Sequence, residues 1–195
     1  MSIKITKLGS KHIATMAVLG ALSIVLLLLI RFPLFLPFLE YDFADIPIIL
    51  CTMMFGTGYG LLLTVIVCII QGILLSSSGI IGVLMHLFAT GTFVLVFGLM
   101  RSKNKSVKWT IVSAVCGVAA WVSIMIGFNL VLTPVFMGLT TAEIIPYLLP
   151  SIIPFNLVKA IGNVSLGVIV YYSVNKFVNL EQFSSTKTSK CDCKK

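Results

Sequence analysis

The sequence predicts an all-α integral membrane protein with six transmembrane helices. Of its 195 residues, 58% are hydrophobic and only 10% are charged, and the mean hydropathy is +1.11. The charged residues stand in short intervals between long apolar stretches. A water-soluble domain of this length needs a polar surface, so this pattern indicates that lipid is the solvent.

The six helices are expected within one membrane domain of residues 1–180, and a basic, disordered tail follows at 181–195. The first apolar run is long enough to span a bilayer, and Arg31-Phe32-Pro33 after it lacks the small residues of a signal-peptide cleavage site. We therefore expect a retained helix there. The predicted helices lie at about residues 12–30, 43–56, 59–76, 80–101, 108–132 and 151–178.

Charge decides how the short second and third segments are interpreted. If only one of them crossed, the basic flank at residues 4–11 and the basic loop at 101–105 would lie on opposite sides of the membrane. If both cross, every basic residue except Arg31 and Lys159 lies on the cytoplasmic side, together with both termini. The acidic residues on the outer side are then Glu40, Asp42, Asp45 and Glu143.

The last three segments are long apolar runs, and two outer connections stand out between the segments. Residues 31–42 are rich in phenylalanine and proline, and residues 133–150 contain three prolines. Both connections are apolar enough to fold back on the protein, so we interpret them as lids.

The sixth segment carries the most informative polar residues. At 100° per residue, Asn156, Lys159 and Asn163 share one helix face, and such a row does not face lipid. Lys159 lies about 12 Å below the start of the helix, within the outer half of the bilayer. Either this face binds a ligand rich in carbonyl or ring-nitrogen acceptors, or Lys159 is a structural residue paired with Asp42, Asp45 or Glu143.

Further candidates lie in three other segments. Asn129 is expected at the same depth as Asn156, where it either binds a ligand or cross-links helices. His86 is a lesser candidate, because a single histidine is more often a packed, hydrogen-bonded residue. In the first segment a small-residue stripe permits close approach of a helix of this chain or of a partner protein; it consists of Ala14, Ala17 and Ala21.

The sequence carries no motif for ATP hydrolysis or metalloprotease chemistry, so neither an enzyme nor a catalytic cofactor is expected. Cys191-Asp192-Cys193 in the tail is a weak ligand set, since two thiols lack further ligands. The basic residues flank apolar segments, which argues against nucleic-acid binding and for membrane topology.

Three sequence segments resemble the S component of energy-coupling factor (ECF) vitamin transporters, in particular the riboflavin-specific type. These segments are Ala17-xxx-Ala21, Tyr41-Asp42-Phe43-Ala44-Asp45-Ile46-Pro47 and Pro154-Phe155-Asn156-Leu157-Val158-Lys159, and Asn129-Leu130-Val131-Leu132-Thr133-Pro134 agrees with them. The resemblance implies a bacterial cytoplasmic-membrane protein that binds riboflavin, FMN or analogues and pairs with a transmembrane T subunit and two ABC ATPases. It places Ala17 and Ala21 on the face toward the T subunit.

The resemblance also implies flavin contacts from Asn129, Asn156 and Lys159, under a first outer loop that closes over the ligand. The full expected substrate-binding set is Phe38, Leu39, Glu40, Tyr41, His86, Asn129, Thr133, Asn156, Lys159 and Asn163. Two alternatives stay open. One is an S component for another vitamin such as thiamine, and the other is a self-sufficient ion-coupled carrier that uses Lys159 or His86 for coupling.

Overall fold

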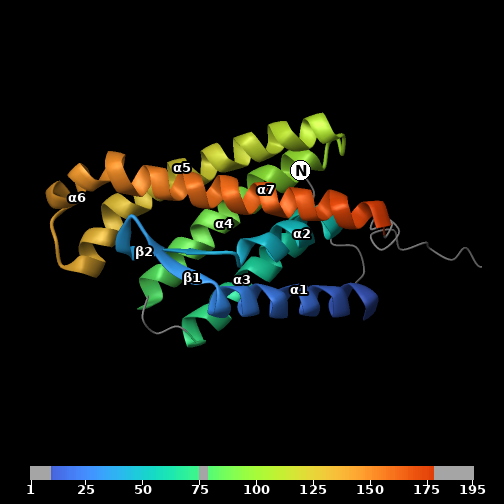
Figure 1. Ribbon diagram of the computed structural model, residues 1–195, viewed down its shortest axis with the longest axis horizontal. Helices are drawn as coiled ribbons and strands as arrows, with labels where there is room; N and C mark the ends of the chain where they lie inside the picture. The colour runs from blue at the N-terminus through green and yellow to red at the C-terminus, as the bar shows by residue number, and fades with distance from the viewer. Residues whose placement is uncertain (1–9, 75–78, 178–195) are drawn as a thin grey trace, which may run out of the picture.

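The computed structural model describes residues 10–74 and 79–177, which form a bundle of helices with one small hairpin (Figure 1). The elements in order are α1 (Ser10–Leu29), β1 (Arg31–Leu34), β2 (Leu36–Asp42), α2 (Asp45–Phe55), α3 (Thr57–Leu74), α4 (Gly79–Arg101), α5 (Val107–Met137), α6 (Thr141–Tyr147), a π-helical turn η2 (Leu148–Ile152) and α7 (Ile153–Phe177).

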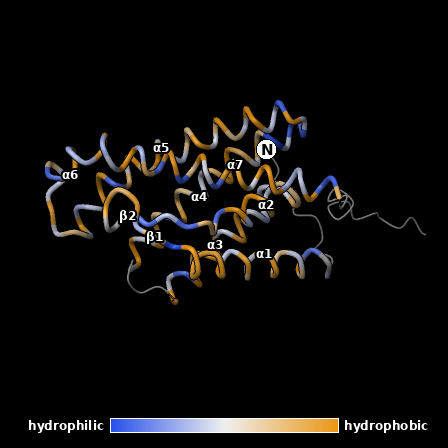
Figure 2. Tube along the Cα trace, in the orientation of Figure 1, coloured by the Kyte–Doolittle hydropathy of each residue, from blue (hydrophilic) through white to orange (hydrophobic). Residues whose placement is uncertain are grey.

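The predicted all-α membrane fold is confirmed. Within residues 10–74 and 79–177, five helical stretches are long and apolar enough to cross a membrane, with α6, η2 and α7 counted as one. Figure 2 shows hydrophobic residues along these helices and hydrophilic ones where α4 meets α5 and where α7 ends. The remaining predicted segment, α2, has only 11 residues and is therefore about 17 Å long, much shorter than a hydrocarbon core of about 30 Å.

Helix α2 forms the centre of the bundle, with α1, α3, α4 and α7 around it. Its Ile48, Ile49 and Cys51 are completely buried. Helices α2 and α3 pack closely at Gly60 of α3, where an added Cβ would clash with the side-chain hydroxyl of Thr52. Because α2 is enclosed by other helices, the polar residues at its N-terminal end are also enclosed.

The first outer connection, interpreted from the sequence as a lid, is a β-hairpin. β1 and β2 pair in antiparallel fashion, with a register irregularity between Pro33 and Leu34 and a left-handed residue, Phe35, at the turn. Strand pairing satisfies backbone hydrogen bonds in a segment where apolar side chains leave little access for water. The hairpin contacts α1 and α7 and lies toward the same end of the bundle as α6 (Figure 1).

The second outer connection, residues 133–150, is largely helical. α5 continues past the predicted end at residue 132 to Met137, and Gly138 in the left-handed region ends it by donating its backbone N–H to Pro134. A capping box between Thr140 and Glu143 then begins α6. Both signals stand in the sequence, and Pro134 and Pro146 lie inside α5 and α6 without ending them.

Candidate functional site

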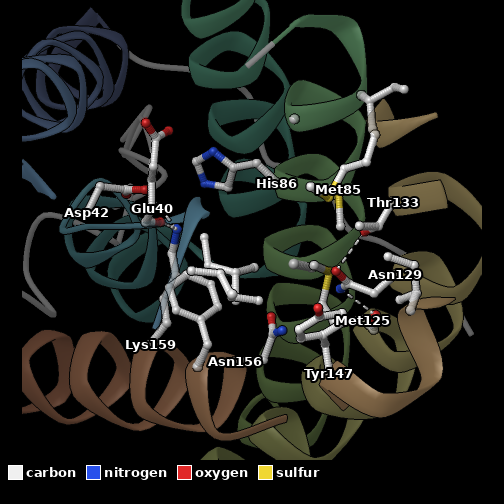
Figure 3. A pocket seen from close by; sticks show the side chains of 18 of the residues that line it. Glu40, Asp42, Met85, His86, Met125, Asn129, Thr133, Tyr147, Asn156 and Lys159 are labelled. Carbon is white, nitrogen blue, oxygen red and sulfur yellow. Dashed lines mark hydrogen bonds and ion pairs between the residues drawn. The ribbon is translucent and has the colours of Figure 1, made fainter. Parts of the chain in front are cut away.

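A cavity of about 530 Å³ lies beneath the hairpin and α6, between α4, α5 and α7. Its volume falls within the usual range for small-molecule sites, and apolar residues dominate its wall. It gathers seven of the predicted site residues: Leu39, Glu40, His86, Asn129, Thr133, Asn156 and Lys159. In Figure 3, Lys159 and Asp42 lie on one side, Asn129 and Thr133 on the other, and Asn156 between them.

Lys159 ties α7 to the hairpin. Its Nζ lies 2.7 Å from the Asp42 Oδ2 atom and donates to the Glu40 carbonyl oxygen at 3.4 Å. Both side chains are largely buried, at 12% exposed for Lys159 and 7% for Asp42. The ion pair of the structural alternative therefore exists, and the same lysine also lines the cavity. An ammonium has three donors, so this pairing does not prevent it from binding a ligand.

The two predicted asparagines, Asn129 on α5 and Asn156 on α7, line the same cavity. Each donates one amide hydrogen to a carbonyl of its own helix, at 2.8 Å to Met125 and 2.9 Å to Ile152. Asn129 also accepts from Thr133 at 3.0 Å. A carboxamide has two N–H donors and an oxygen with two lone pairs, so each amide is fixed in orientation while part of its capacity stays available to a ligand.

A buried polar network forms one side of the cavity. Asp45 Oδ1 accepts from Thr90 at 2.6 Å and lies 3.0 Å from His86 Nε2, while its Oδ2 accepts from Asn163 at 2.8 Å. The other ring nitrogen of His86 faces the Gln71 side-chain oxygen. This carboxylate is paired by residues of α4 and α7, which locks the N-terminal end of α2 to both helices.

Tyr41 and Asn163 lie behind the cavity wall rather than on it. The Tyr41 hydroxyl donates to Asn163 Oδ1 at 3.2 Å, and Asn163 donates to the Asp42 carbonyl oxygen at 3.0 Å. Burial raises the pKa of the Tyr41 phenol, which keeps the donating proton in place. An ion pair between Arg31 and Glu40 joins the two strands of the hairpin. The side chain of Phe38 lies outside the described residues.

Several cavity residues were not predicted from the sequence. They are Gln71, Met85, Trp121, Met125, Tyr147 and Phe155. A signal for two of them was present, because Trp121, Met125 and Asn129 follow one another at four-residue spacing and share one helix face. Among the described residues, no group of three or more His, Cys, Asp or Glu is arranged to hold a metal ion.

The small-residue stripe lies on the outside of the bundle. Ala14, Ala17 and Ala21 are all exposed. Large apolar side chains of the same helix are exposed beside them, among them Val18 and Leu22. No other described helix of this chain covers this face.

Comparison with known proteins agrees with this architecture. The family model for the ECF transporter substrate-specific component matches residues 11–171. The riboflavin transporter FmnP of Bacillus subtilis is 28% identical over 161 residues, which cover 77% of this chain and 85% of the relative. The riboflavin transporter RibU of Staphylococcus aureus is 27% identical over 183 residues, covering 90% and 96%.

Two solved structures share the fold. An S component of a bacterial ECF transporter superimposes with a TM-score of 0.75 at 22% identity and covers 86% of this chain and 96% of its own. FolT bound with folic acid gives a TM-score of 0.58 at 21% identity, covering 87% and 97%. Since the family model covers most of the chain, this protein belongs to the ECF transporter substrate-specific components, which are transport subunits and not enzymes.

Proposed function

We propose that this chain binds riboflavin from the outer side of a bacterial cytoplasmic membrane and delivers it through an ECF complex. Two relatives at 28% and 27% identity are named riboflavin transporters, which favours this vitamin over thiamine or folate. The chain needs no catalytic cofactor for this role, and riboflavin is the transported ligand.

The observation that carries the proposal is the convergence of Asn129, Asn156 and Lys159 on one cavity. Riboflavin presents an edge of carbonyl oxygens and ring nitrogens that two amides and an ammonium match in donors and acceptors. Its ring plane is apolar and suits the methionine and aromatic side chains of the wall. Leu39 and Glu40 of β2 line the cavity from the hairpin, so we assign the hairpin as the cover of the bound ligand.

The partner assignment rests on the exposed stripe of Ala14, Ala17 and Ala21. Small residues allow the backbone of a second membrane helix to approach closely. We propose that the T subunit docks there, that two ABC ATPases supply the energy, and that both termini are cytoplasmic, as the distribution of basic residues favours. We also propose that residues 1–180 form one membrane domain; the expected tail at 181–195 lies outside the described residues.

The decisive experiment is the visible absorption spectrum of the purified protein, followed by titration with riboflavin, FMN, thiamine and folate. A co-purified flavin spectrum, or saturable binding of riboflavin in preference to thiamine and folate, is the expected result. Binding of thiamine or folate with no flavin binding would overturn the substrate assignment and leave the family unchanged.

A further inference from the structure

One buried donor at the cavity has no hydrogen-bond partner within the described part of the chain. Trp121 of α5 lines the cavity and is only 1% exposed. Its indole Nε1 is excluded from solvent and finds no hydrogen-bond acceptor among the described residues. Buried donors are nearly always paired, because burial without a partner forfeits the hydrogen bond to water.

The other tryptophan of the chain has the hydrogen-bond acceptor that a buried indole N–H usually has. Trp109, on the same helix, donates its Nε1–H to the Met100 carbonyl oxygen at 2.8 Å. Trp121 instead packs against Phe93, with ring centroids 6.2 Å apart and an interplanar angle of 62°. This contact fixes the orientation of the indole ring but offers no lone pair to its N–H.

Trp121 and Asn129 line the cavity at two different positions along α5. The two residues lie about two helical turns, or roughly 12 Å, apart along α5. Met125 stands between them, and all three line the cavity. A ligand that contacts both residues therefore needs acceptors at two separated positions.

Resting on the proposed function, we propose that Trp121 is a specificity-determining residue that donates its indole N–H to a hydroxyl oxygen of the ribityl chain. The acceptors of the isoalloxazine ring lie along one edge, which Asn129, Asn156 and Lys159 already match. The opposite end of the ring carries only methyl groups. The ribityl hydroxyls are the remaining acceptors of riboflavin, so they are the groups that the deeper donor recognises.

The test compares riboflavin with lumiflavin, which has the same ring and a methyl group in place of the ribityl chain. Wild type, Trp121→Phe and the matched control Trp109→Phe are titrated with both flavins, and thermal unfolding is measured for each. Trp121→Phe is expected to weaken riboflavin binding roughly 5- to 30-fold, as for the loss of one buried hydrogen bond, and to leave lumiflavin binding unchanged. Trp109→Phe is expected to lower thermal stability and to change neither affinity.

Equal weakening of both flavins by Trp121→Phe would show that the indole acts through cavity shape alone, and this would overturn the inference. Unchanged riboflavin binding would overturn it as well. If wild type binds neither flavin, the proposed function itself fails, which is a separate outcome. If Trp121→Phe does not fold, benzothienylalanine at position 121 in the Trp109→Phe background keeps the bicyclic shape, removes the N–H and gives the same comparison.

Discussion

The Lys159–Asp42 pair is expected to serve both folding and ligand binding, and a double-mutant cycle separates the two roles. Lys159→Met keeps the unbranched chain and removes the charge. Asp42→Asn removes the partner charge and retains an oxygen for the Ala44 backbone N–H, which donates to Asp42 at 3.1 Å. The cycle consists of wild type, the two single variants and the double variant.

The stability effect follows from burial. With the two side chains 12% and 7% exposed, loss of one partner leaves an uncompensated charge in a largely buried site, which typically costs about 3–5 kcal/mol. Residual exposure and the second bond of Asp42 place Lys159→Met at the lower end of that range. In the double variant no buried charge is left unpaired, so its stability is expected to return close to that of wild type.

The binding effect follows a different pattern. Loss of one ammonium donor to the ligand is expected to cost about 1–3 kcal/mol, or roughly 5- to 150-fold in the Kd for riboflavin. Neutralising Asp42 restores no donor, so the double variant is expected to fold like wild type and still bind weakly. The assays are thermal unfolding in detergent and titration of riboflavin fluorescence. If the double variant bound riboflavin with wild-type affinity, Lys159 would be purely structural and the site assignment would be refuted.

Three further outcomes are expected. Asn156→Ala is expected to weaken riboflavin binding by a similar factor of roughly 5 to 150, whereas the control Ser165→Ala, at an exposed position of the same helix, leaves it unchanged. Equal riboflavin affinities for the two variants would show that Asn156 does not bind the ligand. Replacing both Ala17 and Ala21 with Leu abolishes vitamin uptake by cells and leaves riboflavin binding by the purified protein intact; a parallel loss of binding would contradict a docking role. In vesicles, the chain alone is expected to bind riboflavin but to accumulate it only with the T subunit, both ATPases and ATP, because a ligand shifts a conformational equilibrium only by its differential affinity. If the chain alone accumulated riboflavin and a protonophore abolished this accumulation, the ion-coupled carrier would be favoured.

The sequence alone was sufficient to predict the membrane fold and one face of the site. A bilayer demands long apolar helices whose backbone bonds are internal, so hydropathy locates them. Helical periodicity placed Asn156 and Lys159 together, and both line the cavity. The same periodicity also placed Asn163 on that face, but this residue is turned toward Tyr41 and Asp45 instead. Periodicity assigns a residue to a face of its helix and does not identify what that face meets.

Only the tertiary structure decided which distant segments meet. The sequence offered three acids as partners for Lys159, and the packing of the hairpin on α7 selects Asp42. The proline and phenylalanine residues of the connection at 31–42 indicate only that it is apolar enough to fold back on the protein, whereas its pairing as a β-hairpin is seen only in the tertiary structure. The significance of Trp121 depends on its burial and on the absence of an acceptor among the described residues. Local sequence sets the direction of a side chain along its own helix, whereas its burial and partners arise from segments far apart in the chain that pack together only in the folded protein.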